Sequence, residues 1–64
     1  MRHPHRRKAT CAVWDNLRGL WATDRCTRKE ATAKANRLNE SEDAQTYIQS
    51  NGRWRYEVAT RRAA

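Results

Sequence analysis

The sequence predicts a small α+β domain: a β-hairpin, a helix and a final strand, with the helix packed on a three-stranded sheet. Three observations lead to this fold class. Apolar and polar residues alternate on both sides of a glycine turn over residues 9–26, which is typical of a hairpin. Residues 27–39 combine a helix-capping pair with apolar residues at helical spacing. Residues 53–60 alternate again and complete the sheet.

The hairpin turn is expected at Gly19. A two-residue Arg18-Gly19 loop would force Arg18 to a positive φ, which is costly for a residue with a side chain. A four-residue loop from Asn16 to Gly19, with Gly19 left-handed, avoids this cost. The register that follows pairs two tryptophans across the strands, which contributes about 0.2–1 kcal/mol. Its facing pairs are Asp15 with Leu20, Trp14 with Trp21, and Val13 with Ala22.

A helix is expected over residues 28–39. Thr27 and Glu30 form a capping box, because each side chain can bond the main-chain N–H of the other residue. The helix has one small apolar face and one polar face, made respectively of Ala31, Ala35 and Leu38 and of Lys29, Ala33, Asn36 and Glu40. So narrow an apolar face indicates a helix that lies close on a flat partner, here the sheet.

The sequence of residues 40–52 is compatible with two structures, a second helix or a hairpin. Acidic residues at 40–43 suit the first turn of a second helix, because carboxylates are stabilised at the positive end of a helix dipole. Ala44, Tyr47 and Ile48 follow at helical spacing, and Asn51-Gly52 can cap the helix C-terminus. The alternative is a hairpin around Asn51-Gly52, a favoured two-residue turn. The pattern favours the helix.

The final strand is expected over residues 53–60. Its alternation places Trp54, Tyr56 and Val58 on one face, and Arg53, Arg55 and Glu57 on the other. Which face of the hairpin the helix covers is open. The small Ala31/Ala35 face accepts large partners, which favours Trp14 and Trp21 beneath the helix. If Val13 lies there instead, the tryptophans form an exposed surface suited to a protein contact.

Length and charge limit the function classes. The chain has 64 residues and a net charge of +7, which indicates one domain with an affinity for anionic partners. We expect a basic arm at 1–8, one domain at 9–60 and a basic tail at 61–64. A chain this short buries only about 60% of its unfolded surface, so we expect a homodimer.

No secretory or transmembrane segment is recognisable, so we expect a protein of the host-cell cytoplasm with Cys11 and Cys26 reduced.

The pattern of turn, capping and packing residues resembles that of small proteins of actinobacteria and their phages. The residues concerned are Val13, Asp15, Gly19, Thr27, Glu30, Ala31, Ala35, Leu38, Asn39, Tyr56 and Val58. Proteins of this type have a hairpin, a T-x-x-E-A-x-x-x-A-x-x-L-N helix and a final strand. The resemblance implies a phage or mobile-element origin and binding to a host component, with no defined activity.

We expect a binding protein whose first candidate partner is nucleic acid. A small sheet can enter a major groove and read bases with arginine while flanking cations hold phosphates. Arg28 and Lys29, in the first turn of the helix, add a phosphate contact. The candidate contacts are Arg6, Arg7, Lys8, Arg18, Arg28, Lys29, Arg53, Arg55, Arg61 and Arg62.

The alternative is a phage accessory protein that binds and modulates a host protein. Its contacts would be Trp14, Trp21 and Trp54, because tryptophan dominates many interface energies. Tyr56 is a further candidate contact. Against this, a chain with so few large apolar residues is expected to place at least two of these four aromatic residues in its core.

Catalysis, cofactors and metals are not expected. Recognisable nucleophile–base sets are missing from the sequence, and a catalytic cleft is improbable at this size. His3, His5, Cys11 and Cys26 could bind zinc, but their spacing matches no zinc-finger pattern. We therefore expect a non-enzymatic protein without a metal and with free, packed thiols.

Overall fold

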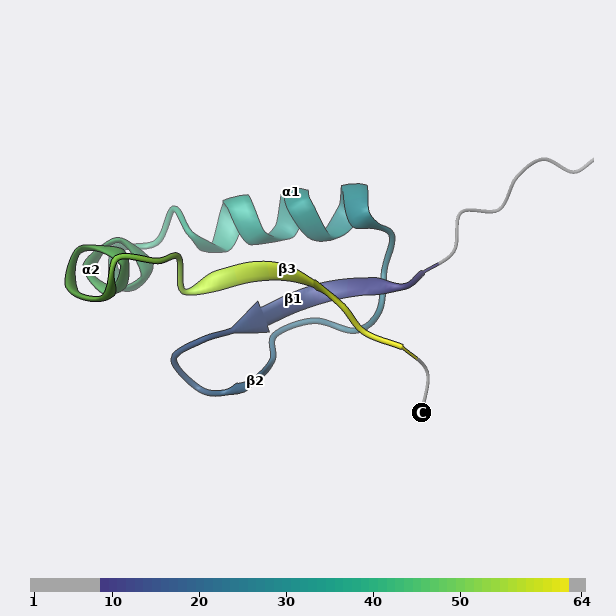
Figure 1. The fold of residues 1–64 in the computed structure, drawn as a ribbon. Helices are drawn as coiled ribbons and strands as arrows, with labels where there is room; N and C mark the ends of the chain where they lie inside the picture. Colours follow the sequence, from purple (N-terminus) through teal and green to yellow (C-terminus); the bar gives the residue numbers. More distant parts are fainter. Residues whose placement is uncertain (1–8, 63–64) are drawn as a thin grey trace, which may run out of the picture.

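The computed structural model describes residues 9–62, which form a three-stranded antiparallel sheet with one helix lying across a face of it (Figure 1). The elements, in chain order, are β1 (Cys11–Asp15), β2 (Leu20–Trp21), α1 (Arg28–Leu38), α2 (Glu42–Asn51) and β3 (Tyr56–Thr60). The strand order is β2-β1-β3, so the first strand is central. The predicted α+β class of hairpin, helix and strand is confirmed.

The hairpin has the predicted loop and register. Trp14 lies opposite Trp21 and Asp15 opposite Leu20. Gly19 closes the four-residue loop with φ +69°, and its N–H donates to the Asp15 carbonyl at 2.8 Å. β2 is short because the chain bulges beyond Ala22: Val13 N–H donates to the Thr23 hydroxyl rather than to a carbonyl. Main-chain pairing resumes between Cys11 and Cys26.

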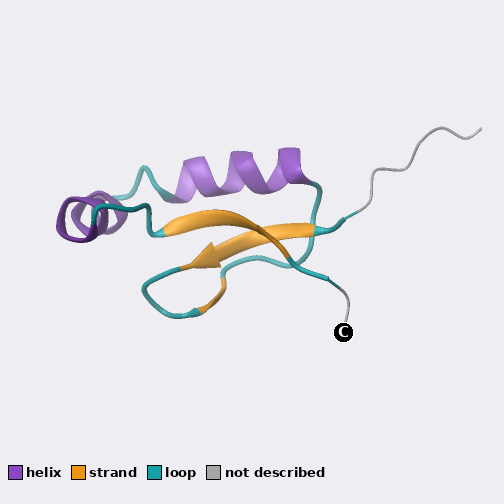
Figure 2. Ribbon diagram, in the orientation of Figure 1, coloured by secondary structure: helices purple, strands orange, loops and turns teal. Residues whose placement is uncertain are grey.

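The helix α1 has the expected caps, whereas α2 begins at Glu42, two residues after the start of the acidic stretch expected to form its first turn. The capping box of α1 is formed by Thr27 and Glu30, and Asn39 is its C-cap. Ser41 caps the N-terminus of α2, and Gly52 ends that helix in the left-handed conformation with φ +74°. The helical interpretation of residues 40–52 is therefore correct, and no hairpin forms at Asn51-Gly52. Figure 2 shows α2 at the end of the sheet where the hairpin loop also lies.

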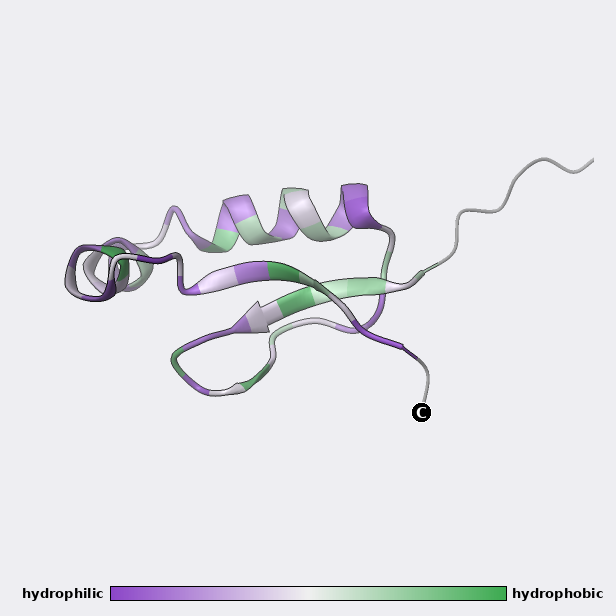
Figure 3. Ribbon diagram, viewed as in Figure 1, coloured by the Kyte–Doolittle hydropathy of each residue, from purple (hydrophilic) through white to green (hydrophobic). Residues whose placement is uncertain are grey.

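The helix α1 covers the Val13 face of the sheet, so the expectation of tryptophans beneath it is wrong. Val13 is fully buried and packs with Ala31 and Ala35. Small helix residues do not make room for indole rings: they let the helix approach the sheet so closely that only small and medium side chains are fully enclosed between the two, and larger ones lie at the margin. The rest of this core consists of Cys11 and Cys26, with Leu38, Tyr56 and Val58 packed against it. In Figure 3 the hydrophobic colour marks β1 and the middle of β3, and it also appears on α1, on α2 and in the hairpin loop.

The third strand starts at Tyr56, three residues later than expected. Residues 53–55 are bent because the hairpin loop holds them. The Asn16 side chain donates to the Trp54 carbonyl at 2.9 Å, and the Asn16 N–H donates to the Arg55 carbonyl at 2.7 Å. Arg53 and Arg55 therefore do not share a strand face. Beyond the bend, β3 pairs along the whole of β1.

Neither helix in the described region has the length and apolar character needed to cross a membrane.

Candidate nucleic-acid interface

The sheet face opposite α1 carries an aromatic pair. Trp14 and Trp21 meet edge to face, with ring centroids 5.0 Å apart and planes at 81°. Both side chains are half-buried, and Ala12, on the same face of β1, is fully buried. Such a pair contributes about 0.5–1.5 kcal/mol beyond the area it buries. It leaves part of the indole surface open to a ligand.

Arg61 is fixed against this pair. Its guanidinium carbon lies 5.2 Å from the centroid of the Trp21 ring, a cation–π contact. Its side chain also donates to the Thr23 carbonyl at 2.9 Å, and its main-chain N–H donates to the Thr10 carbonyl at 2.8 Å. Arg61, expected in a tail, is thus part of the folded domain.

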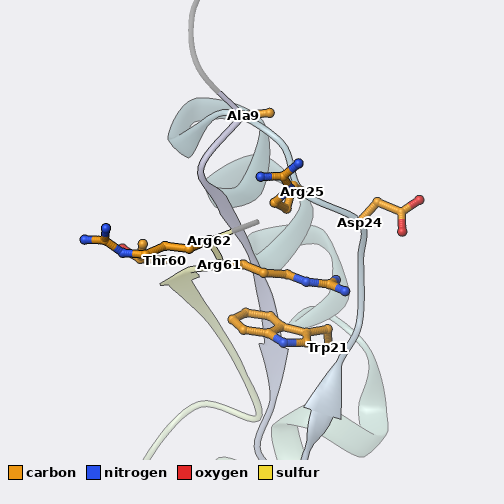
Figure 4. A pocket seen from close by; sticks show the side chains of 7 residues that line it. All are labelled: Ala9, Trp21, Asp24, Arg25, Thr60, Arg61 and Arg62. Atoms are coloured by element: carbon orange, nitrogen blue, oxygen red, sulfur yellow. The ribbon is translucent and has the colours of Figure 1, made fainter. Parts of the chain in front are cut away.

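A pocket opens beside Trp21 and carries more positive than negative charge (Figure 4). In this view Arg61 lies alongside the Trp21 ring, and Arg25 lies on the other side of Arg61 from that ring. The Asp24 carboxylate points away from all three side chains. The lining residues are Ala9, Trp21, Asp24, Arg25, Thr60, Arg61 and Arg62. The Arg61 and Arg25 side chains therefore lie on the Trp21 side of the pocket, whereas the Arg62 side chain, like the Asp24 carboxylate, points away from the ring.

A neighbouring depression extends the basic surface around the β2 edge toward α1. It shares Trp21, Asp24 and Arg61 with the first pocket and adds Lys34. Arg25 and Lys34 were not among the candidate residues from sequence. The position of Arg25 could have been predicted from the sequence. Arg25 precedes the core residue Cys26 in an extended segment, and successive side chains in such a segment point to opposite faces.

The other predicted cations lie apart from this pocket. Arg18 is exposed in the hairpin loop, and Arg28 and Lys29 are exposed in the first turn of α1. Arg53 is exposed and pairs with Glu57 at 2.8 Å. Arg6, Arg7 and Lys8 lie outside the described residues. A role for these residues in binding stays a prediction.

Arg55 is buried, which corrects its placement on an exposed strand face. It is 8% exposed and donates to both carboxylate oxygens of Asp15, at 3.1 and 3.2 Å. Burial alone would raise the pKa of Asp15, but hydrogen bonds from Arg55 and from the loop N–H groups of Arg18 and Leu17 outweigh it and lower the pKa. A guanidinium held in this way has no surface to offer a phosphate.

The three tryptophans do not form one surface. Trp14 and Trp21 pair on the open sheet face, whereas Trp54 is 43% exposed and lines a separate groove with Asn39, Tyr56 and Val58. A host-protein contact through all three at once is therefore not supported by the geometry.

The four residues that could bind zinc are only partly within the described region. Cys11 and Cys26 are buried free thiols, and His3 and His5 lie outside that region. Across residues 9–62, no cluster of three or more histidine, cysteine or acidic residues is arranged to hold a metal ion.

The fold and this surface together define a small basic α+β domain with an aromatic, arginine-lined sheet face. No family model, curated protein or solved structure matches the chain.

Proposed function

We propose that this protein binds single-stranded nucleic acid on the open face of its sheet. The observation that carries the proposal is the contact between Trp21 and Arg61, with Arg25 lining the same pocket. Proteins that bind single strands combine aromatic rings, on which bases stack, with cations that follow the phosphates. Both elements occur here within one pocket.

A single strand suits this surface better than a duplex. Bases in a duplex are stacked on one another, so they can reach an indole ring only after they are splayed out. Groove reading by Arg53 and Arg55, the sequence-based hypothesis, loses its support because Arg55 is buried against Asp15. What the open face offers is a stacking surface with basic flanks.

Fluorescence anisotropy with labelled oligonucleotides tests the proposal. Protein is titrated into single-stranded RNA, single-stranded DNA and a duplex of the same sequence, at low and at physiological salt. We expect the single strands to bind more tightly than the duplex. Their affinity should fall with salt, with a slope of about −0.7 per phosphate neutralised on a logarithmic plot. Equal affinity for duplex and single strand would contradict stacking of bases on the protein. Absence of binding at low salt would contradict nucleic-acid binding altogether.

Two variants locate the site. Arg25 is exposed, so Arg25→Ala should leave the fold intact and reduce the salt slope by about 0.7. Trp21→Ala removes the stacking ring and should cost about 1–3 kcal/mol per stacked base. The matched controls are Arg37→Ala, an exposed arginine of α1, and Trp54→Ala, the tryptophan outside the pocket. Equal effects of Arg25→Ala and Arg37→Ala would indicate general charge attraction without a defined site.

A protein partner is the second candidate, and exposed Trp54 is the observation in its favour. A pulldown from the presumed host, repeated with Trp54→Ala and with Trp21→Ala, separates the two candidates. Loss of one specific protein with Trp54→Ala alone, at a salt concentration that abolishes oligonucleotide binding, would favour the accessory-protein function.

The homodimer expected from the small core stays a prediction. Sedimentation equilibrium of the nucleic-acid-free protein, over a range of concentrations, tests it. A single species with the mass of one chain would contradict it.

A further inference from the structure

Two free cysteines face each other across the end of the sheet. Cys11 is the first residue of β1, and Cys26 lies two residues before α1. They form an antiparallel bridge in which each main-chain N–H donates to the other residue's carbonyl, at 2.9 and 2.7 Å. Both belong to the same core cluster beneath α1, so both side chains lie on the same face of the sheet.

The Cα spacing of this pair suits a disulfide, whereas its Cβ spacing is wider than a disulfide has. Residues that exchange both hydrogen bonds in an antiparallel pair have Cα atoms about 5.5 Å apart, and disulfides most often join Cα atoms about 5.5–6 Å apart. The Cβ atoms of facing residues are about 4.5–5.5 Å apart, against about 3.5–4.5 Å in a disulfide. The bond would draw the two segments slightly together, and a bond formed under such tension is more easily reduced.

We infer that Cys11 and Cys26 form a reversible disulfide, so that the end of the sheet is a redox-sensitive site. The inference is independent of nucleic-acid binding. In a reducing compartment the pair is a dithiol packed in the core, as the structure shows. A low-molecular-weight disulfide, such as oxidised glutathione, is the class of oxidant that converts it.

The reaction takes place by two exchange steps. The thiolate of one cysteine attacks the small disulfide, forms a mixed disulfide and releases one small thiol. The second cysteine thiolate attacks the protein sulfur of that mixed disulfide, closes the Cys11–Cys26 bond and releases the second small thiol. Two protein thiols are oxidised and one external disulfide is reduced to two thiols.

Burial makes access the slow step. Cys11 is 4% and Cys26 is 6% exposed, so the first attack requires local opening. Cys26 lies outside the regular strands, in the segment between β2 and α1, and such segments open at lower free energy than the centre of a sheet. Once closed, the bond joins the two ends of the segment that contains the whole hairpin, and it should stabilise the fold by restricting the unfolded chain.

Mass spectrometry of the folded protein tests the inference. The full chain is incubated with oxidised glutathione in native buffer, alkylated and digested with trypsin without reduction. We expect residues 9–18 and 26–28 to be recovered as one cross-linked species that a reductant separates. The oxidised protein should also unfold at a higher urea concentration than the reduced protein.

Cys26→Ala is the matched control, because alanine is small enough for the site and cannot close the bond. Under the same oxidant it should give only the mixed disulfide at Cys11 or a cross-linked dimer, without the rise in urea midpoint. The inference is overturned if wild-type protein gives only these intermolecular products. It is also overturned if the intramolecular bond forms only in denaturant, or if that bond lowers the urea midpoint.

Discussion

Arg55 and Asp15 form a buried, bidentate ion pair that joins the residue before β3 to the last residue of β1. The Arg55 Nε and Nη2 atoms donate to the two carboxylate oxygens of Asp15, at 3.1 and 3.2 Å, across 40 residues of sequence. The Oδ1 atom of Asp15 also accepts from the N–H groups of Leu17 and Arg18. One carboxylate therefore organises both the hairpin loop and the entry to the last strand.

Arg55→Leu should destabilise the domain by about 3–5 kcal/mol, because it leaves the Asp15 charge buried without its partner. The double variant with Asp15→Asn should recover part of the lost stability. Its amide oxygen still accepts from the loop N–H groups, and the unpaired buried charge is no longer present. Urea unfolding followed by circular dichroism measures both. The control, Arg53→Leu, removes an exposed ion pair with Glu57 and should cost about 0–1 kcal/mol. Equal costs for the two arginines would contradict the buried role of Arg55.

Acid should weaken the fold through two carboxylates. Hydrogen bonds from Arg55 and the hairpin loop lower the pKa of Asp15 against the effect of burial, and hydrogen bonds from Asn16 and Arg53 lower the pKa of Glu57. In the unfolded chain these pKa values return to about 3.9 and 4.3. The stabilisation is therefore present above these values, and it is lost as the pH falls through the lower values of the folded state.

The free energy of unfolding, measured in urea from neutral pH to strong acid, should accordingly fall below about pH 4.3. The double variant Asp15→Asn with Arg55→Leu should show a shallower fall, because one of the two carboxylates no longer titrates. Glu40→Gln, which removes an exposed carboxylate, is the comparison. A slope in the double variant as steep as in the wild type would exclude Asp15 as a cause.

The Asn39 side chain satisfies both main-chain hydrogen-bonding groups of Tyr56. Its Nδ2 donates to the Tyr56 carbonyl at 2.9 Å and its Oδ1 accepts from the Tyr56 N–H at 3.1 Å, as a neighbouring strand would. Asn39→Ala should cost about 1–3 kcal/mol, because two main-chain groups lose their partners. Asn36→Ala, an exposed asparagine of α1, should change the unfolding midpoint little. A cost for Asn39→Ala no larger than that control would show that water replaces the side chain.

Thr27→Ala should reduce stability by about 0.5–2 kcal/mol, because it removes the N-cap acceptor of α1. The Thr27 hydroxyl accepts from the Glu30 N–H at 3.2 Å, and the Glu30 carboxylate accepts from the Thr27 N–H at 2.9 Å. Thr32→Ala, at an exposed position inside the same helix, should be neutral or stabilising, because alanine has the higher helix propensity. Thermal unfolding should show a loss of stability for Thr27→Ala and none for Thr32→Ala, and an equal loss in both variants would argue against capping.

The sequence by itself determined the elements whose causes are local. Thr27 and Glu30 are three residues apart, Gly52 ends the second helix, and Gly19 closes one turn. Such features depend on spacing of a few residues and on a backbone conformation that glycine adopts most easily, so they can be predicted without knowledge of the rest of the chain. The hairpin register follows in the same way from the loop length.

The tertiary structure alone decided which sheet face α1 covers and which side chains meet over long distances. Val13 lies beneath the helix because the alanine face allows close approach, and the tryptophans consequently lie on the open side. Arg55 and Arg61 look alike in sequence, yet one is buried against Asp15 and the other lies over Trp21. Contacts between residues some 40 positions apart leave no periodic signal, because they depend on how the elements pack together. The candidate site could therefore be located only in the folded chain.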